Sequence, residues 1–300
     1  MTDTEQSVLF LVNEKSGRVH DEGAETIESN LRAALPSGAE ARFVLGDVPT
    51  LLKAQRASKA GTVATVGGDG TIGAVAGQLA GRDDPPRFLP LPYGTANFIP
   101  RDIGMPLEPV EALARAMAAE TRRIDYATVN DAPLLHSAIF GTFAEIAEER
   151  EAVRNAKDFG GRVRALAAAA GKLFGSEALS YHLVVDGEPL DARTNTVFVT
   201  NNAITGGERG VPQRDRLDDG YLVVYVSDSV GPFGFVQRII EAGTGGFDAS
   251  DGIVRHVCHE AVVTADGPLV YARDGEVEEG ESEARFRIRP GALCVPDLRG

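Results

Sequence analysis

The sequence lacks the features that mark secreted, membrane-spanning or nucleic-acid-binding proteins. Its two cysteines, Cys258 and Cys294, are too few for a disulfide framework. The first residues, Met-Thr-Asp-Thr-Glu-Gln-Ser, contain no basic and no apolar stretch of the kind found in signal peptides. No apolar run approaches the roughly 20 residues that a membrane span needs. The formal net charge of −14 disfavours nucleic acid as a partner. These absences predict a cytoplasmic protein that contacts a membrane, if at all, peripherally at its inner face.

The pattern of the first part of the chain is that of an α/β domain. Apolar runs suited to buried parallel strands alternate with segments of helical spacing. We expect strands at 7–12, 41–44, 62–67 and 88–91, and helices near 22–35, 49–61, 70–79 and 109–118. This alternation predicts a parallel sheet with helices on both faces, formed by residues 1–121.

Beyond residue 121 the pattern changes to short strands separated by turns such as Asn130-Asp131 and Asp186-Gly187. We expect strands at 124–129, 134–140, 179–185, 196–200, 221–226, 253–259 and 285–288. Residues 122–290 are therefore predicted to form a mainly antiparallel β domain, with 291–300 packing back on the first domain. A basic amphipathic helix is expected at about 154–175, where it would either meet a membrane surface or pack on the β domain.

The most informative stretch is Thr62–Ala76, where a β-branched run ends in glycines around a single carboxylate, Asp69. A strand, a glycine turn and a helix together suit phosphate, because the first N–H groups of a helix lack partners within the helix and its dipole favours anions. An aspartate beside phosphate indicates that Mg²⁺ bridges them. The alternative is a tight turn in which Asp69 caps the following helix.

Two other phosphate loops fit this stretch less well. A P-loop needs a lysine after its glycines, and none follows here. Gly68-Asp69-Gly70-Thr71-Ile72-Gly73 matches the spacing of a dinucleotide fingerprint, but no acidic residue follows at the distance that the ribose contact needs. We therefore reject the dinucleotide interpretation.

Two further polar turns follow predicted strands, Asn13-Glu14-Lys15-Ser16-Gly17 and Gly94-Thr95-Ala96-Asn97. The carboxyl ends of parallel strands lie at one edge of a sheet, which is where open α/β sheets bind their ligands. The three turns are thus expected to converge on one ligand site.

Together these turns resemble those of the diacylglycerol kinase-type lipid kinases. That family includes bacterial lipid kinases and sphingosine kinases, and it shares its nucleotide-binding design with NAD kinases and phosphofructokinases. Later in the chain, Asp218-Asp219-Gly220-Tyr221-Leu222 is similar to the family's Asp-Gly metal segment, and Asp274-Gly275-Glu276 is similar to its late catalytic segment. The resemblance covers nearly the whole chain. It implies an NAD kinase- or phosphofructokinase-like α/β domain with a parallel sheet, followed by a mainly antiparallel β-sandwich domain.

The resemblance implies ATP- and Mg²⁺-dependent transfer of the γ-phosphate to a lipid hydroxyl at the membrane surface, on diacylglycerol or a similar lipid alcohol. By the same likeness, the residues that bind ATP are Asn13, Gly67, Gly68, Asp69, Gly70, Thr71, Gly94, Thr95 and Asn97. Asp274 would be the general base on the acceptor hydroxyl, with Glu276 beside the metal.

The resemblance also implies two places for Mg²⁺. Asp69 would help to hold the ion at the phosphates. Asp219 would hold a second, structural ion together with the backbone carbonyls of Arg216 and Tyr221.

Two departures from the family pattern leave the acceptor open. Glu14 stands where the family usually has proline, and Phe98-Ile99 stand where it usually has Asp-Phe. A kinase of the same fold that acts on a soluble hydroxyl such as NAD is one alternative, and a non-catalytic nucleotide-binding regulator is another. For Asp274-Gly275 the alternative is a plain hairpin turn. A homodimer also stays open, since the sequence does not determine the oligomeric state.

Overall fold

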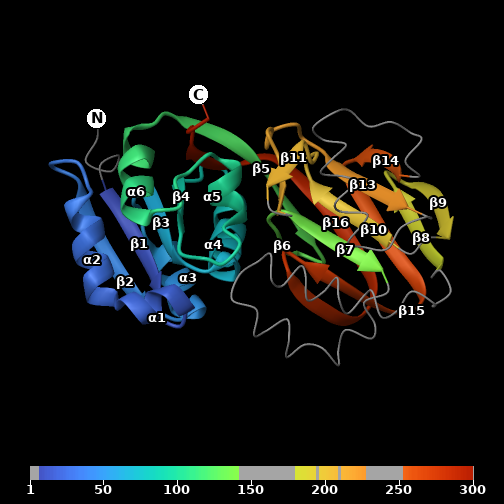
Figure 1. Cartoon of the computed structure of the whole chain (residues 1–300), viewed down its shortest axis with the longest axis horizontal. Coiled ribbons are helices and arrows are strands. Elements are labelled where there is room, and N and C mark those ends of the chain that lie inside the picture. The colour runs from blue at the N-terminus through green and yellow to red at the C-terminus, as the bar shows by residue number, and fades with distance from the viewer. Residues whose placement is uncertain (1–6, 142–179, 194–195, 209–210, 228–252, 300) are drawn as a thin grey trace. The chain divides into compact units, whose positions relative to one another are not determined.

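The computed structural model describes residues 7–141, 180–193, 196–208, 211–227 and 253–299. The chain divides into two compact units, Met1–Tyr126 with Gly291–Gly300, and Ala127–Pro290. Figure 1 shows helices and strands in the first unit and mainly strands in the second. The helix predicted at 154–175 lies outside the described residues.

The first unit is built on a parallel sheet. β1 lies between β2 and β3, β3 lies between β1 and β4, and all three pairs are parallel. The strands are β1 (Ser7–Asn13), β2 (Glu40–Gly46), β3 (Thr62–Gly67) and β4 (Arg87–Pro92). β1, β3 and β4 are almost entirely buried, as expected for strands covered on both faces.

Helices pack against this sheet in two groups, with α3 beside α4 and α2 beside α6 (Figure 1). The helices are α1 (Gly17–Glu22), α2 (Ala24–Ala33), α3 (Val48–Ala57), α4 (Asp69–Ala80), α5 (Phe98–Asp102) and α6 (Pro109–Ala118). The single helix expected at 22–35 is replaced by α1 and α2. Gly23 lies between them with φ of 82°, which ends the first helix and starts the second.

The second unit is mainly antiparallel. Its strands are β6 (Ala132–Leu134), β7 (Ser137–Gly141), β8 (Ser180–Val185), β9 (Glu188–Arg193), β10 (Thr196–Asn201), β11 (Gly206–Glu208), β12 (Val211–Gln213), β13 (Leu222–Ser227), β14 (Ile253–Cys258), β15 (Glu260–Arg273) and β16 (Glu276–Pro296). β5 (Thr121–Val129) runs from the first unit into the second. The end of β16 returns to the first unit, where Cys294 pairs in parallel with Arg87 of β4.

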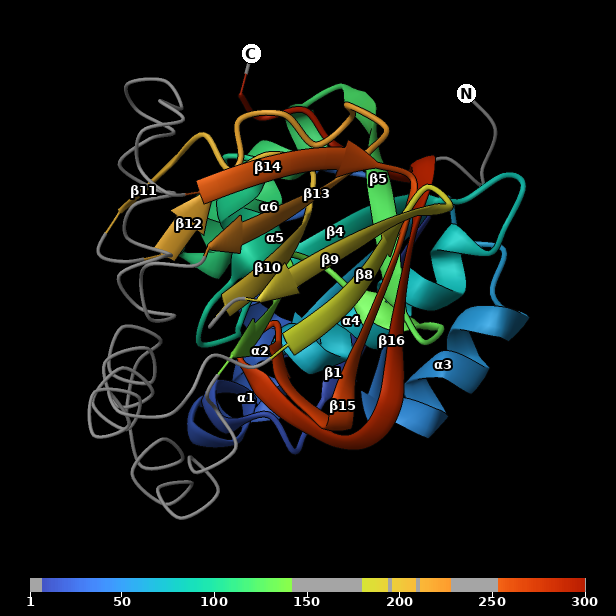
Figure 2. The ribbon, with the colours of Figure 1, turned by 90° about the vertical axis from the view of Figure 1, so that its right-hand side faces the viewer.

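β15 and β16 form a long hairpin (Figure 2). β15 joins two groups of strands, because it pairs with β8, the partner of β9, and with β7, the partner of β10. The first half of β15 pairs with β8 and its second half pairs with β7, with an irregular register between Thr264 and Leu269. Phe140 lies at the centre of the core, with its ring 4.8 Å from that of Tyr271 and 5.9 Å from that of Phe286. Aromatic packing of this kind adds to the burial of apolar area.

The predicted fold class is confirmed, with a parallel α/β part followed by a mainly antiparallel β part. The expectation of a single strand at 134–140 is wrong, because two separate strands, β6 and β7, occupy this segment with a short turn between them. No strand was expected over the residues of β15, and only 285–288 were expected as a strand within the much longer β16.

Candidate functional site

The three polar turns lie at one edge of the parallel sheet. Asn13 is the last residue of β1, Gly67 is the last residue of β3, and Pro92 ends β4. The side-chain amide of Asn13 donates to the Thr71 hydroxyl at 2.7 Å, and its oxygen accepts from the Lys15 backbone N–H at 3.1 Å. The first turn is therefore joined directly to the glycine loop.

The glycine loop leads straight into α4. Gly68 is extended, with φ of −74° and ψ of 173°, and its carbonyl accepts from the N–H groups of Thr71 and Ile72. A Cβ atom at Gly67 would lie 3.0 Å from the Thr71 side chain, so a larger residue here would require that side chain to shift. The first N–H groups of α4 lack partners within the helix, and they can face an anion.

The carboxylate of Asp69 holds the second turn. Its Oδ2 accepts from the Ala96 N–H at 3.1 Å, and its Oδ1 accepts from the Phe98 N–H at 3.3 Å. Asn97 closes the same turn with φ of 53°, accepting from the Gly94 N–H at 2.8 Å and donating to the Gly94 carbonyl at 2.9 Å. Asp69 thus ties the loop after β3 to the loop after β4.

This contact requires glycine at position 94. A Cβ atom there would lie 2.6 Å from Asp69 Oδ2 and 3.1 Å from Asn97 Oδ1. We expect Gly94→Ala to push the Asp69 carboxylate aside, at a cost of about 1–3 kcal/mol. If the turn binds nucleotide and this energy is lost from binding, ATP affinity should fall by about 5- to 150-fold, which calorimetry can measure. Gly17→Ala is the matched control, because a Cβ there meets nothing within 4 Å.

The structure adds Arg18 to this edge, a residue that the sequence patterns did not single out. Its Nη1 donates to the Pro92 carbonyl at 3.2 Å, its Nε donates to Glu22 at 2.7 Å, and its guanidinium lies 5.2 Å from the centre of the Tyr93 ring. The arginine therefore ties α1 to the start of the second turn. In the sequence, the feature that could have pointed to Arg18 was its position as a basic residue directly after the first polar turn.

The remaining predicted ATP residues are also at this edge. Gly70 and Thr95 are exposed, whereas Thr71 and Asn97 are buried. The edge thus presents both rigid, hydrogen-bonded residues and residues open to a ligand.

In the β unit, Asp274 and Gly275 form the two-residue turn between β15 and β16, with φ of 49° and 87°. The Asp274 carboxylate accepts from three successive backbone N–H groups, those of Leu135 at 2.8 Å and of His136 and Ser137 at 2.9 Å. Asp274 is half-buried, and this burial raises the pKa of its carboxyl, although the three donors act in the opposite direction. Glu276, the first residue of β16, is exposed.

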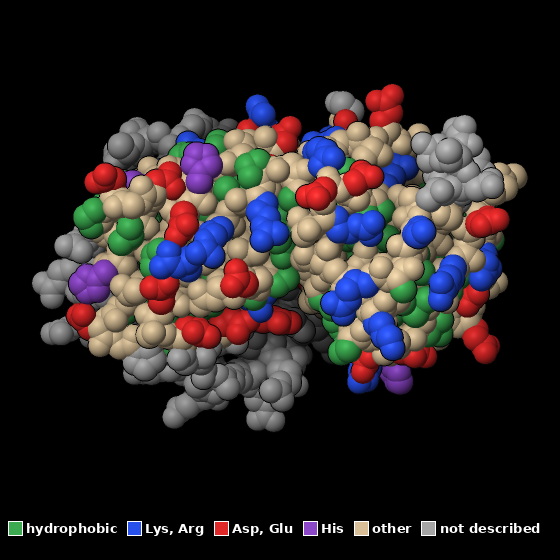
Figure 3. All heavy atoms as spheres, turned by 180° about the vertical axis from the view of Figure 1, so that it is seen from behind, with side chains coloured by type: hydrophobic (Ala, Val, Ile, Leu, Met, Phe, Trp, Pro, Cys, Tyr) green, Lys and Arg blue, Asp and Glu red, His purple; other side chains and the backbone are tan. Residues whose placement is uncertain are grey.

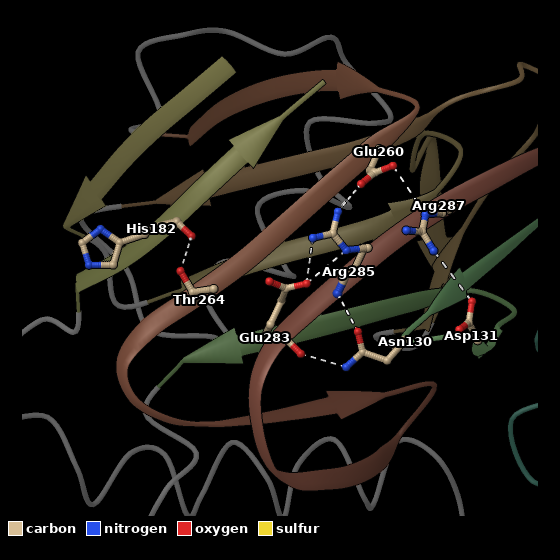
Figure 4. Close-up of polar contacts among 8 residues, drawn as sticks. All are labelled: Asn130, Asp131, His182, Glu260, Thr264, Glu283, Arg285 and Arg287. Atoms are coloured by element: carbon tan, nitrogen blue, oxygen red, sulfur yellow. Dashed lines mark hydrogen bonds and ion pairs between the residues drawn. The ribbon is translucent and has the colours of Figure 1, made fainter. Parts of the chain in front are cut away.

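Two other hairpins in this unit use the same device. Asp186 has φ of 48° and its Oδ1 accepts from the N–H groups of His259 and Glu260 at 2.8 and 2.9 Å. Asn130 has φ of 47° and its side chain bridges Arg285 N–H and the Glu283 carbonyl, as Figure 4 shows. A left-handed Asp or Asn that anchors a neighbouring segment is therefore a structural feature of this unit. Asp274 differs in using both carboxylate oxygens.

Asp219 lies in a polar turn between β12 and β13. Its Oδ1 is 2.7 Å from Arg216 Nε, and its Oδ2 accepts from the Tyr221 hydroxyl at 3.0 Å. The backbone carbonyl of Tyr221 accepts from Asn202 N–H at 3.1 Å. Oxygen donors of the kind that Mg²⁺ prefers are present. However, a cation at the carboxylate would have to displace the Arg216 side chain.

No helix among the described residues is long and apolar enough to cross a membrane. On the face shown in Figure 3, Lys and Arg side chains lie among Asp and Glu side chains. Opposite charges therefore offset one another locally on this face, within a chain whose formal net charge is −14.

Comparison with known proteins identifies two matching family models. One is described as the diacylglycerol kinase catalytic domain and matches residues 7–129. The other is described as the YegS C-terminal NAD kinase beta sandwich-like domain and matches residues 140–296.

Similar chains extend over the whole length. A "Probable lipid kinase YegS-like" from Pseudomonas fluorescens is 28% identical over 97% of this chain and 95% of its own. A "Diacylglycerol kinase" from Staphylococcus aureus is 23% identical over 71% of this chain and 67% of its own. A crystal structure from Bacillus anthracis has a TM-score of 0.77 at 22% identity, covering 99% of this chain and 96% of its own, which shows a shared fold.

Proposed function

Because the chain belongs to the YegS-like lipid kinases, with a diacylglycerol kinase catalytic domain and a YegS C-terminal domain, we propose that it transfers the γ-phosphate of ATP to the hydroxyl of diacylglycerol or a similar lipid alcohol. The diacylglycerol kinase among its relatives supports this class of acceptor. Such an acceptor would place the reaction at a membrane surface.

The single observation that carries the proposal is the cluster at the sheet edge, where Asp69 holds the turn after β4 and Asn13 holds the glycine loop. Phosphoryl transfer asks mainly for positioning and for neutralisation of the transferred oxygens. The N-terminal end of α4, together with the glycine loop that precedes it, supplies N–H donors for phosphate. Each Asp69 oxygen uses one lone pair on the second turn, which leaves a position for a cation. Mg²⁺ bound there would neutralise phosphate charge.

Asp274 is the group that we assign to the acceptor. A carboxylate has about four lone-pair positions, and three of them are used by backbone N–H groups. The remaining position, on Oδ2, is available to take the proton of a hydroxyl. Burial favours this role, because it raises the pKa of Asp274 and so its basicity. Glu276, exposed two residues later, is proposed to lie beside the metal.

A second Mg²⁺ at Asp219, with the carbonyls of Arg216 and Tyr221, is proposed as a structural ion. Binding there would release the Arg216 guanidinium from its 2.7 Å contact with the carboxylate. The competition predicts weak binding, because the ion must replace a charge that is already present.

The proposed function is tested with γ-labelled ATP and a panel of acceptors. Diacylglycerol, ceramide, sphingosine and monoacylglycerol are presented in mixed micelles, and NAD is added as a soluble acceptor in a parallel set. Label is expected in the organic phase with one of the lipids. Label that appears only in NAD would contradict lipid as the acceptor.

A further inference from the structure

Asn202 is a fully buried polar residue that no predicted role includes. It lies just after β10 with φ of 66°, a left-handed conformation that asparagine tolerates better than most residues. Its N–H donates to the Tyr221 carbonyl at 3.1 Å, and its own carbonyl accepts from the Thr200 hydroxyl at 2.7 Å. Its backbone is thus fixed on both sides.

The side chain of Asn202 connects two loops. Its Oδ1 accepts from the Asp219 N–H at 3.1 Å, and its Nδ2 donates to Asn201 Oδ1 at 3.1 Å. A backbone N–H can only donate, so the amide oxygen must face Asp219 and the amide nitrogen must face Asn201. The amide orientation is therefore determined by its surroundings.

The connection continues to Asp274. The N–H of Asn201 donates to the His136 carbonyl at 3.0 Å, and the N–H of His136 donates to Asp274 Oδ1 at 2.9 Å. Every donor in this series points toward Asp274, beginning at the Asp219 N–H. The Asn202 side-chain amide accepts one bond and donates the next, so these two bonds polarise one another. The later bonds are joined mechanically, through the residues Asn201 and His136.

The series is also enclosed. Asn201 is 3% exposed and His136 is 1% exposed. The Asn201 carbonyl accepts from the buried guanidinium of Arg214 at 2.6 Å. A buried polar group left without its partner is costly, so each member holds the next in place.

We propose that Asn202 is a positioning residue for phosphoryl transfer, which through Asn201 and His136 keeps a backbone donor on Asp274 and fixes that carboxylate relative to the Asp219 turn. The inference rests on the proposed function, in which Asp274 acts on the acceptor hydroxyl. A general base works only in one narrow geometry, and a misplacement of about 1 Å can cost about 10²-fold in rate.

The test uses the full chain with Asn202→Gly and Asn202→Asp. Glycine keeps the left-handed backbone at little cost and removes both side-chain bonds. Aspartate at this position keeps an oxygen that accepts from the Asp219 N–H. Its second oxygen cannot donate to Asn201 Oδ1, so the variant loses only the bond that connects position 202 to Asn201 and, through it, to His136. Amide hydrogen exchange of His136 and Asp219 is followed by NMR, and kcat and the KM for ATP are measured with diacylglycerol micelles.

We expect Asn202→Gly to speed exchange at both amides by about tenfold or more. The Asp219 N–H loses its acceptor, and His136 keeps Asp274 as its acceptor but loses the support that Asn202 gives through Asn201. We expect kcat to fall about tenfold with little change in the KM for ATP. Asn202→Asp should speed exchange at His136 and leave Asp219 protected.

Asn130→Gly is the matched control. Asn130 has φ of 47° and its amide also bridges two backbone groups, but on Arg285 and Glu283 (Figure 4). It should leave kcat and the exchange of His136 unchanged. Unchanged exchange at His136 in Asn202→Gly, or an equal loss of kcat in both variants, would overturn the inference. Failure of the proposed base would look different, since Asp274→Asn would then keep its kcat while exchange at His136 still responded to Asn202→Gly.

Discussion

Replacing Asp274 by asparagine should lower kcat by about 10²–10⁴, the usual contribution of a general base, while the KM for ATP stays near its wild-type value. Asparagine has the size of aspartate and tolerates the left-handed turn conformation, but it cannot take a proton from a hydroxyl. The measurement is steady-state kinetics with the acceptor that the lipid panel identifies.

The structure shows that this substitution also has a structural effect. With its oxygen on His136 and Ser137, the asparagine would place an NH₂ group against the Leu135 N–H. Two donors that face each other in a half-buried position cost about 1–3 kcal/mol of stability. The thermal unfolding of the variant must therefore be measured beside its kinetics, and kcat must be compared well below the unfolding range.

Asp186→Asn is the matched control for Asp274→Asn. Asp186 occupies the same turn position in a neighbouring hairpin, and a single oxygen accepts both of its backbone N–H bonds. The asparagine oxygen can keep those bonds, so we expect little loss of kcat. Near-normal kcat in folded Asp274→Asn would exclude it as the base. A large loss of ATP affinity would instead place this residue at the nucleotide.

The convergence of the three turns at one sheet edge was largely predictable, because it follows a local rule. Ligands of parallel α/β sheets bind beyond the carboxyl ends of the strands, and each of the three turns could be recognised from its own glycine, asparagine or aspartate. The partners of these residues were not predictable. Nothing near Asp69 in the sequence indicates that its carboxylate holds Ala96 and Phe98, because that contact depends on how two loops lie side by side.

The β unit was harder to predict for a physical reason. β16 contains the acidic run Glu276-Val277-Glu278-Glu279-Gly280-Glu281, in which every residue except Val277 has low strand propensity. It is a strand because it pairs with β15, and arginines such as Arg285 bind the nearby glutamates Glu260 and Glu283 (Figure 4). The hydrogen bonds of Asn202 could not be predicted from the sequence for a similar reason. Two asparagines directly after an apolar strand were the signal, but their partners lie far away in sequence.

The structure shows what Phe98 does at the position where the family pattern usually has aspartate. Phe98 is 3% exposed and begins α5, and its N–H donates to Asp69. Where the resembling family usually places a second carboxylate, this chain therefore has a packed ring and a backbone donor. Asp69 is then the one acidic residue among the glycine loop and the second turn, and any charge that the proposed site offers to Mg²⁺ would depend on it.

For this reason we expect Asp69→Ala to lower kcat by about 10² or more, the scale of losing one preorganised electrostatic group. The variant also frees the N–H groups of Ala96 and Phe98, so the KM for ATP should rise as the second turn loosens. The two effects are separated by titrating Mg²⁺ at saturating ATP. If Asp69 holds the ion, the Mg²⁺ concentration for half-maximal rate rises in the variant. If Asp69 only holds the turn, that concentration stays the same.

Asp47→Ala is the control for Asp69→Ala. Asp47 follows β2 at the same edge and caps α3, accepting from the Thr50 N–H at 3.2 Å. Its loss should weaken α3 and leave the dependence of kcat on Mg²⁺ unchanged. Wild-type enzyme assayed in excess chelator should be inactive. Full activity under chelator would show that no divalent cation takes part, and Asp69 would then be a residue that only holds the second turn against the glycine loop.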